Sequence, residues 1–193
     1  MLNSIKFLKD FRCFKKGDTF SFPDGVTLLV GEQGCGKSSL LKMLADDGGA
    51  FNRDEYLKVD LTEAVEKNSA PLMYFDCERH NPRVSEPDPN NAETYATYLM
   101  SRFVSHGEAI LPILSYVAKA TVPTVFLIDE PDMALSIRSI GKLVKAFKKA
   151  AKAGHQIVAS AHNPFLIMGF KQVYSLEHRK MMTSDDFIKA HQI

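Results

Sequence analysis

The sequence has few cysteines, almost no net charge and no long apolar segment. Its 24 Lys and Arg residues nearly balance 23 Asp and Glu residues, which leaves a net charge of +1. This balance excludes a general nucleic-acid-binding coat but permits a local basic patch. The three cysteines, Cys13, Cys35 and Cys77, form no CxxC pair and cannot all pair with one another. We therefore expect reduced thiols and a cytoplasmic protein.

The sequence also shows no membrane-spanning segment and no signal peptide. No stretch approaches the roughly 18 apolar residues that a membrane-spanning helix needs. Met1–Asp10 carries a charge every few positions, so it lacks the apolar core of a signal peptide. Repeats and low-complexity segments are absent too. The 193 residues, of which 45% are hydrophobic, therefore predict one globular domain over 1–193 that meets a membrane only through a partner.

Short apolar runs bounded by turn residues predict the strands. Ile5–Leu8 and Thr19–Phe22 are expected to pair antiparallel. The other expected strands are Val26–Val30, Leu72–Phe75, Thr124–Ile128, Gln156–Ser160 and Gln172–Ser175. The expected helices are Lys37–Ala45, Ala92–Val104, Gly107–Ala120, Ser136–Ala153, a short one before Gln172, and Ser184–His191 with Ser184 as its cap. This alternation predicts an α/β fold with a largely parallel sheet flanked by helices and an N-terminal antiparallel strand pair.

A glycine-rich loop follows the strand at Val26–Val30 and fits the pattern G-x-x-x-x-G-K-[ST]. Glycines let successive backbone N–H groups turn inward around an anion, and the N-terminus of the next helix adds partial positive charge. Lys37 is expected to reach the β- and γ-phosphates of ATP, and Ser38 to offer its hydroxyl to Mg²⁺. The residues expected to surround the nucleotide are Gly31, Glu32, Gln33, Gly34, Cys35, Gly36, Lys37, Ser38 and Ser39. The alternative, a turn with a coincidental Lys-Ser pair, is disfavoured by the flanking strand and helix.

Cys35 lies within this loop, where a helix N-terminus lowers the pKa of a thiol. We interpret it as a small residue that fills a small space; a redox-sensitive thiol is the alternative.

Two carboxylates end the most strand-like run of the chain. Asp129, at the C-terminal end of that strand, is placed to hold Mg²⁺, and Glu130 to accept a proton from a water that attacks the γ-phosphate. Two acids that merely open a turn before Pro131 are the alternative. The phosphate loop upstream favours the catalytic interpretation.

Four further segments strengthen a resemblance to the ABC-type ATPases, on the RecF/SMC-like side of the AAA-family P-loop proteins. They are Phe11–Phe14, Ser105–Glu108 with its Ser-His-Gly-Glu signature, the D-loop at Pro131–Ser136, and the switch-histidine segment Ala161–Pro164. The sequence is most similar to small stand-alone ATPases with that signature, over residues 1 to about 175.

The resemblance implies a homodimer that forms head to tail around ATP. One subunit would contribute Lys37, Ser38, Asp129, Glu130 and His162, together with Arg12 as a nucleotide contact. The other would contribute Ser105 and Gly107 at a helix N-terminus that faces the γ-phosphate. His162 could instead cap a strand-to-helix turn, and Ser105 could be an ordinary N-cap.

The sequence departs from the ABC pattern after the strand at Leu72–Phe75, where a glutamine usually follows. Here Asp76 or Glu78 would have to replace it, Asp76 as a metal ligand. Residues 78–120 leave room only for a reduced helical region. Two alternatives to a dimerising ATPase remain open: the ATP-driving subunit of a membrane transporter, and a nucleotide-gated binding module that does not hydrolyse ATP.

Cations recur on one face of the expected helix Ser136–Ala153. They are Arg138, Lys142, Lys145, Lys149 and Lys152. The opposing apolar face is expected to be Ile140, Val144, Phe147 and Ala151. A solvated outer face is the simplest interpretation. The alternative is a weak, salt-dependent contact with nucleic-acid phosphates.

Overall fold

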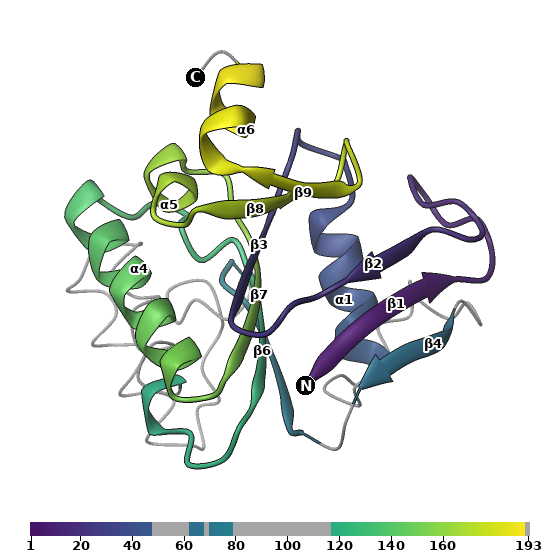
Figure 1. The fold of residues 1–193 in the computed structure, drawn as a ribbon, viewed down its shortest axis with the longest axis horizontal. Helices are drawn as coiled ribbons and strands as arrows, with labels where there is room; N and C mark the ends of the chain where they lie inside the picture. Colours follow the sequence, from purple (N-terminus) through teal and green to yellow (C-terminus); the bar gives the residue numbers. More distant parts are fainter. Residues whose placement is uncertain (48–61, 68–69, 79–116, 192–193) are drawn as a thin grey trace, which may run out of the picture.

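The computed structural model describes residues 1–47, 62–67, 70–78 and 117–191, which fold around two sheets (Figure 1). The strands are β1 (Leu2–Phe7), β2 (Thr19–Ser21), β3 (Val26–Val30), β4 (Thr62–Lys67), β5 (Leu72–Asp76), β6 (Val125–Asp129), β7 (Gln156–Ser160), β8 (Gln172–Ser175) and β9 (Lys180–Thr183). The helices that lie wholly within the described residues are α1 (Lys37–Asp47), α4 (Ile137–Lys152), α5 (Pro164–Met168) and α6 (Ser184–Ala190).

The central sheet has the strand order β5-β6-β7-β3-β8-β9. Every pairing in it is parallel except β8 with β9. Strands β6 and β7 are buried along their whole length, as expected of parallel strands covered on both faces. The expected α/β fold with a largely parallel sheet is confirmed. Because parallel strands end at the same edge, the loops after β3, β6 and β7 meet there and build the site.

An antiparallel sheet of order β2-β1-β4 lies beside α1 on one side of the central sheet (Figure 1). Apolar side chains of β1, β2 and α1 share one buried cluster with residues of β3. Phe7 stacks on Phe14 with ring centroids 4.4 Å apart, and Phe20 meets both edge-on. These aromatic contacts hold the turn after β1 against strands β1 and β2. The expected antiparallel pair is confirmed.

Helices α4, α5 and α6 cover the other face of the central sheet (Figure 1). Ser136 caps α4, and its hydroxyl accepts a hydrogen bond from the N–H of Ser139. The buried face of α4 consists of Ser139, Ile140, Leu143, Phe147 and Ala150. The expected apolar face was therefore wrong at two positions: Leu143 and Ala150 are buried, whereas Val144 and Ala151 are only partly so.

Other expectations need correction at the ends of elements. Thr183, not Ser184, caps α6, because its hydroxyl accepts from the N–H of Asp186 while the Ser184 hydroxyl donates to the carbonyl of Phe170. Strands β4 and β9 were not expected. The expected loop and helices between residues 81 and 116, with Ser105 and Gly107, lie outside the described residues.

All three cysteines are free thiols, as expected. Across the described ranges, no helix combines the length and the apolar character needed to cross a bilayer.

Candidate functional site

The phosphate loop turns directly from the end of β3 into α1. Gly34 and Gly36 have φ angles of 84° and 102°, a region that favours glycine. At Gly36 a Cβ would also meet the Sγ of Cys13 and lie 2.8 Å from the Cζ of Phe14. The loop can take this path only because position 36 has no side chain.

Lys37 begins α1 and folds back over the loop. Its ammonium donates hydrogen bonds to the carbonyl oxygens of Gly31, at 2.7 Å, and Glu32, at 3.0 Å. The side chain is only 5% exposed. A buried cation held this way gives the loop a fixed positive charge at the N-terminus of a helix, where an anion is already favoured.

Ser38 and Asp129 lie in direct contact between α1 and the end of β6. The Ser38 hydroxyl donates to Oδ1 of Asp129 at 3.0 Å, and the Ser160 hydroxyl donates to the same oxygen at 2.7 Å. Burial raises the pKa of Asp129, and the two hydrogen bonds partly offset this. A buried carboxylate beside a hydroxyl supplies the oxygen ligands that Mg²⁺ prefers, so this donor set fits that ion.

Replacing Asp129 by Asn is expected to raise the melting temperature of the nucleotide-free protein at neutral pH. Burial raises the folded-state pKa of Asp129 above its unfolded value, so the stability that this group contributes is present at low pH. It is lost as pH rises through the folded pKa. Thermal unfolding of both proteins, measured from acidic to neutral pH, tests the expected difference in melting temperature. We also expect MgATP to stabilise the unaltered protein and the substitution to abolish that stabilisation. A lower melting temperature of the nucleotide-free variant would contradict the account.

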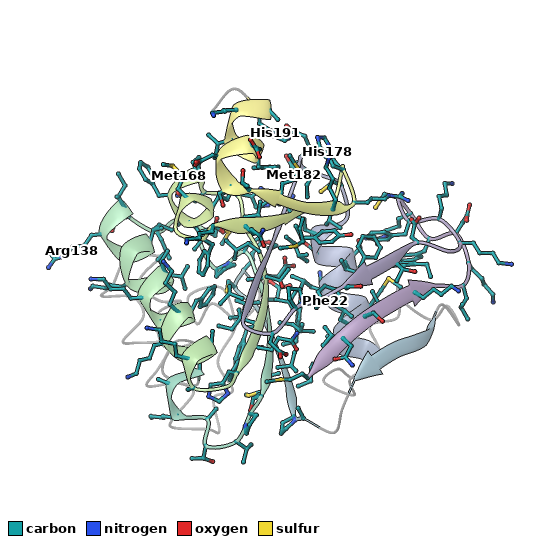
Figure 2. All side chains as sticks on the ribbon, viewed as in Figure 1. Phe22, Arg138, Met168, His178, Met182 and His191 are labelled. Carbon is teal, nitrogen blue, oxygen red and sulfur yellow. The ribbon has the colours of Figure 1, made fainter. Side chains whose placement is uncertain are left out.

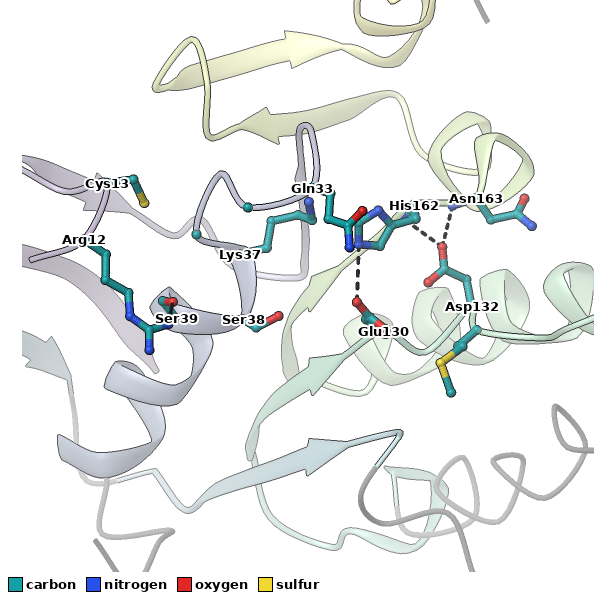
Figure 3. Close-up of a pocket in the computed structure, with 13 residues that line it drawn as sticks. Arg12, Cys13, Gln33, Lys37, Ser38, Ser39, Glu130, Asp132, His162 and Asn163 are labelled. Carbon is teal, nitrogen blue, oxygen red and sulfur yellow. Dashed lines mark hydrogen bonds and ion pairs between the residues drawn. The ribbon is translucent and has the colours of Figure 1, made fainter. Parts of the chain in front are cut away.

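Glu130 follows Asp129 in a strained backbone conformation, with φ of 53°. Its N–H donates to the Ser160 hydroxyl at 2.7 Å, which holds the turn. Oε1 of Glu130 lies 3.5 Å from Nε2 of His162, and Figure 3 shows these side chains facing one another. Burial, and then the charge of Asp129, raise the pKa of Glu130. A carboxylate with a raised pKa is a better general base near neutral pH.

Asp132 ties the segment after β6 to the segment after β7 (Figure 3). Its Oδ2 accepts hydrogen bonds from the backbone N–H groups of His162, at 2.7 Å, and Asn163, at 2.6 Å. The side chain is 6% exposed. In the sequence, Asp132 belongs to the D-loop segment, but nothing there indicates a partner for it, because its partners are backbone groups some 30 positions away. The hydrogen bond from the His162 N–H holds the backbone of that residue, and so the base of its side chain, in place relative to Glu130.

Replacing Asp132 by Ala is expected to slow ATP hydrolysis about 10- to 100-fold with little change in KM, since charged hydrogen bonds of this kind are worth about 1.5–3 kcal/mol. The reason is that His162 loses its fixed position while the phosphate loop is untouched. Steady-state phosphate release gives kcat and KM separately. Asp132→Asn keeps an acceptor oxygen and should recover most of the rate, so equal losses in both variants would oppose a positioning role.

The turn after β1 forms the opposite wall of the site. The guanidinium of Arg12 donates to the Ser39 hydroxyl at 2.7 Å, and the Cys13 thiol donates to the carbonyl of Cys35 at 3.1 Å. Arg12 also has a left-handed backbone, with φ of 50°. Arg12 and Ser39, both expected to contact nucleotide, are thus brought to one edge of the loop.

A cavity of about 740 Å³ opens between these walls. Its lining includes nine of the expected residues: Arg12, Gln33, Gly34, Gly36, Lys37, Ser38, Ser39, Glu130 and His162. It also includes four residues of the named segments that were not singled out as site residues: Cys13, Asp132, Met133 and Asn163. Gly31, Glu32 and Cys35 belong to the loop but do not line the cavity. A space of this size fits a nucleotide.

Asp76 lies next to Asp129 at the ends of paired strands. It does not line the cavity; its Oδ2 is 3.8 Å from the ammonium of Lys42, and its Oδ1 accepts from the N–H of Glu78. Its charge nevertheless acts on Asp129, whose pKa it helps to raise. The expected metal role of Asp76 stays a prediction.

The turn between β8 and β9 holds the phosphate loop from outside. Oε1 of Glu177 accepts from the N–H of Glu32 at 2.6 Å, and Oε2 lies 3.1 Å from Nε2 of His191. Arg179 in the same turn forms an ion pair with Asp18. These contacts join the N-terminal sheet, the loop and α6, and no local sequence pattern indicated them.

Comparison with known proteins gives the same picture of the fold. A sequence profile described as "ATPase family associated with various cellular activities (AAA)" matches residues 27–169, and one described as "AAA domain" matches residues 7–45. None of the curated proteins matches the chain.

Two solved structures share its architecture. One, described as an inward-facing conformation of a metal-chelate type ABC transporter, is 15% identical with a TM-score of 0.63, over 98% of this chain and 88% of that chain. The other, described as an ATP binding subunit of an ABC transporter, is 16% identical with a TM-score of 0.58, over 100% and 94%. At these identities the likeness concerns the fold.

Proposed function

This chain belongs to the AAA family, the ATPase family associated with various cellular activities, and on that basis we propose that it binds ATP with Mg²⁺ and hydrolyses it to ADP and phosphate. The contact that carries the proposal is the one between Ser38 and Asp129, at 3.0 Å, beside Lys37 on the phosphate loop. It joins the phosphate-binding and metal-binding halves of one site.

Five polar residues that line the cavity, and Asp129 beside it, have roles in this proposal. Lys37 and the N–H groups of the loop bind phosphate oxygens, and Ser38 and Asp129 hold Mg²⁺, which neutralises phosphate charge when bound. Glu130 accepts a proton from the attacking water. His162, 3.5 Å from the Glu130 carboxylate, orients that water, and Asp132 keeps His162 in place.

We further propose that the chain is an ABC-type ATPase of the RecF/SMC-like kind and works as an ATP-dependent homodimer. The exposure of two cavity residues supports this: Glu130 and His162 are each more than a third exposed, so a partner subunit could contact them. Ser105 and Gly107 of a second subunit would close it. Hydrolysis would release the two subunits and drive a partner process.

A second candidate function is the ATP-driving subunit of a membrane transporter. It is favoured by the two structural neighbours, both described as ABC transporter proteins. Stable co-purification with an integral membrane protein would support it.

The experiment that tests the proposed activity is phosphate release from purified protein with ATP and Mg²⁺. Turnover that needs Mg²⁺ and stops in Asp129→Ala supports hydrolysis at this site. ATP binding without turnover would instead indicate the nucleotide-gated binding module.

A further inference from the structure

All the charged side chains of helix α4 are positive. Its 16 residues include 6 cations and no acid. These cations are Arg138, Lys142, Lys145, Lys148, Lys149 and Lys152, and all of them are exposed. This excess of positive charge on one helix contrasts with the net charge of the whole chain, which is only +1.

Five of these cations form one straight row. Arg138, Lys142, Lys145, Lys149 and Lys152 fall within an arc of about 80° on the helix, at about 100° per residue, and the row is about 21 Å long. We name these five residues the basic row. Figure 2 shows Arg138 projecting from α4 away from the sheet. Lys148 lies beside the row, and its ammonium is 5.5 Å from the centre of the Phe170 ring.

Within the described part of the chain, no acidic side chain pairs with the basic row. None of the ion pairs between described residues involves a cation of α4. Gly141 lies next to the row, exposed and with open space around it, so a ligand can approach the backbone closely there. Five adjacent cations without acids repel one another, and an anionic ligand would relieve that repulsion.

The composition of the basic row and the packing of α4 distinguish between three kinds of anionic partner: a membrane, a protein and a nucleic acid. The apolar face of α4 is packed in the core through Ile140, Leu143 and Phe147, so the helix cannot insert an apolar face into a bilayer. Four of the five cations are lysines, which are depleted at protein interfaces, and no aromatic side chain lies in the row. Each strand of a duplex carries one phosphate per about 3.4 Å of its axis, so about 21 Å of duplex contains about six phosphates per strand. Those on the near side of the duplex can reach the row.

We propose that the basic row of α4 binds the sugar–phosphate backbone of nucleic acid, without base specificity. The surface is separate from the ATP cavity, which α4 does not line. Nucleic-acid binding by the basic row can therefore be tested independently of ATP hydrolysis.

The test is fluorescence anisotropy with a short fluorescein-labelled DNA duplex and the full chain, between about 50 and 200 mM salt. Five phosphate contacts predict a slope of about −4.5 in log K against log salt, which weakens binding about 500-fold across that range. The variant Lys142→Ala/Lys145→Ala/Lys149→Ala should reduce the slope to about −1.8 and weaken binding at least 10-fold at low salt.

The matched control is Lys9→Ala/Lys180→Ala/Lys189→Ala, which removes the same charge from exposed positions elsewhere. It should bind the duplex nearly as well as the unaltered protein, and both triple variants should hydrolyse ATP normally. No binding at low salt, or an equal loss in both variants, would overturn the proposal. So would binding of phosphatidylserine vesicles or polyglutamate through the row when the duplex is not bound.

Discussion

Replacing Glu130 by Gln is expected to lower the rate of phosphate release by about 10²- to 10⁴-fold, the usual contribution of a general base. The amide keeps the shape of the side chain but cannot accept a proton from water. The raised pKa of Glu130, caused by burial and by Asp129, suits this role. ATP binding should be unchanged, because Lys37 and Ser38 are untouched.

Two measurements on this variant separate catalysis from assembly. Single-turnover phosphate release gives the chemical rate, and light scattering with saturating ATP gives the oligomeric state. The variant should accumulate as a dimer, since the step that releases the subunits is blocked. Asp24→Asn is a matched control, being an exposed carboxylate that does not line the cavity. An undiminished rate in Glu130→Gln would exclude Glu130 as the base.

Replacing Lys37 by Met is expected to weaken ATP binding about 10- to 100-fold and to abolish turnover. The expected loss reflects charge-assisted hydrogen bonds of about 1.5–3 kcal/mol. Methionine keeps the length of the stem but removes the ammonium that now donates to the carbonyls of Gly31 and Glu32. Titration calorimetry with ATP in the presence of Mg²⁺ measures the loss directly.

The control for this prediction is Lys42→Met, five residues further along α1. Lys42 faces Asp76 rather than the cavity, so ATP should bind that variant with nearly unaltered affinity. Comparable affinity of Lys37→Met and the unaltered protein would mean that nucleotide binds somewhere other than this loop.

The central sheet and the phosphate loop could be predicted because their signals are local. Val26–Val30 is a continuous apolar run, and the glycine pattern after it has a meaning only between a strand and a helix. Strand β4 could not be predicted in this way. Its sequence, Thr-Glu-Ala-Val-Glu-Lys, has no apolar run, and it forms through pairing with β1 about 60 residues earlier.

The same distinction separates the residues of the site. Asp129 and Glu130 end an apolar strand, which marks them in the sequence. Asp132 acts on the backbone of residues 162 and 163, and Glu177 on the backbone of Glu32. Backbone partners leave no trace in the sequence pattern, so only the fold reveals these two carboxylates.

The most direct test of the whole account mixes two inactive variants, Lys37→Met and Ser105→Arg. If each subunit completes the pocket of the other, a mixed dimer contains one pocket with both native residues and one with neither. Mixing equal amounts should therefore restore phosphate release that neither variant shows alone. A mixture that stays inactive, although light scattering shows mixed dimers with ATP, would contradict a pocket shared between two copies.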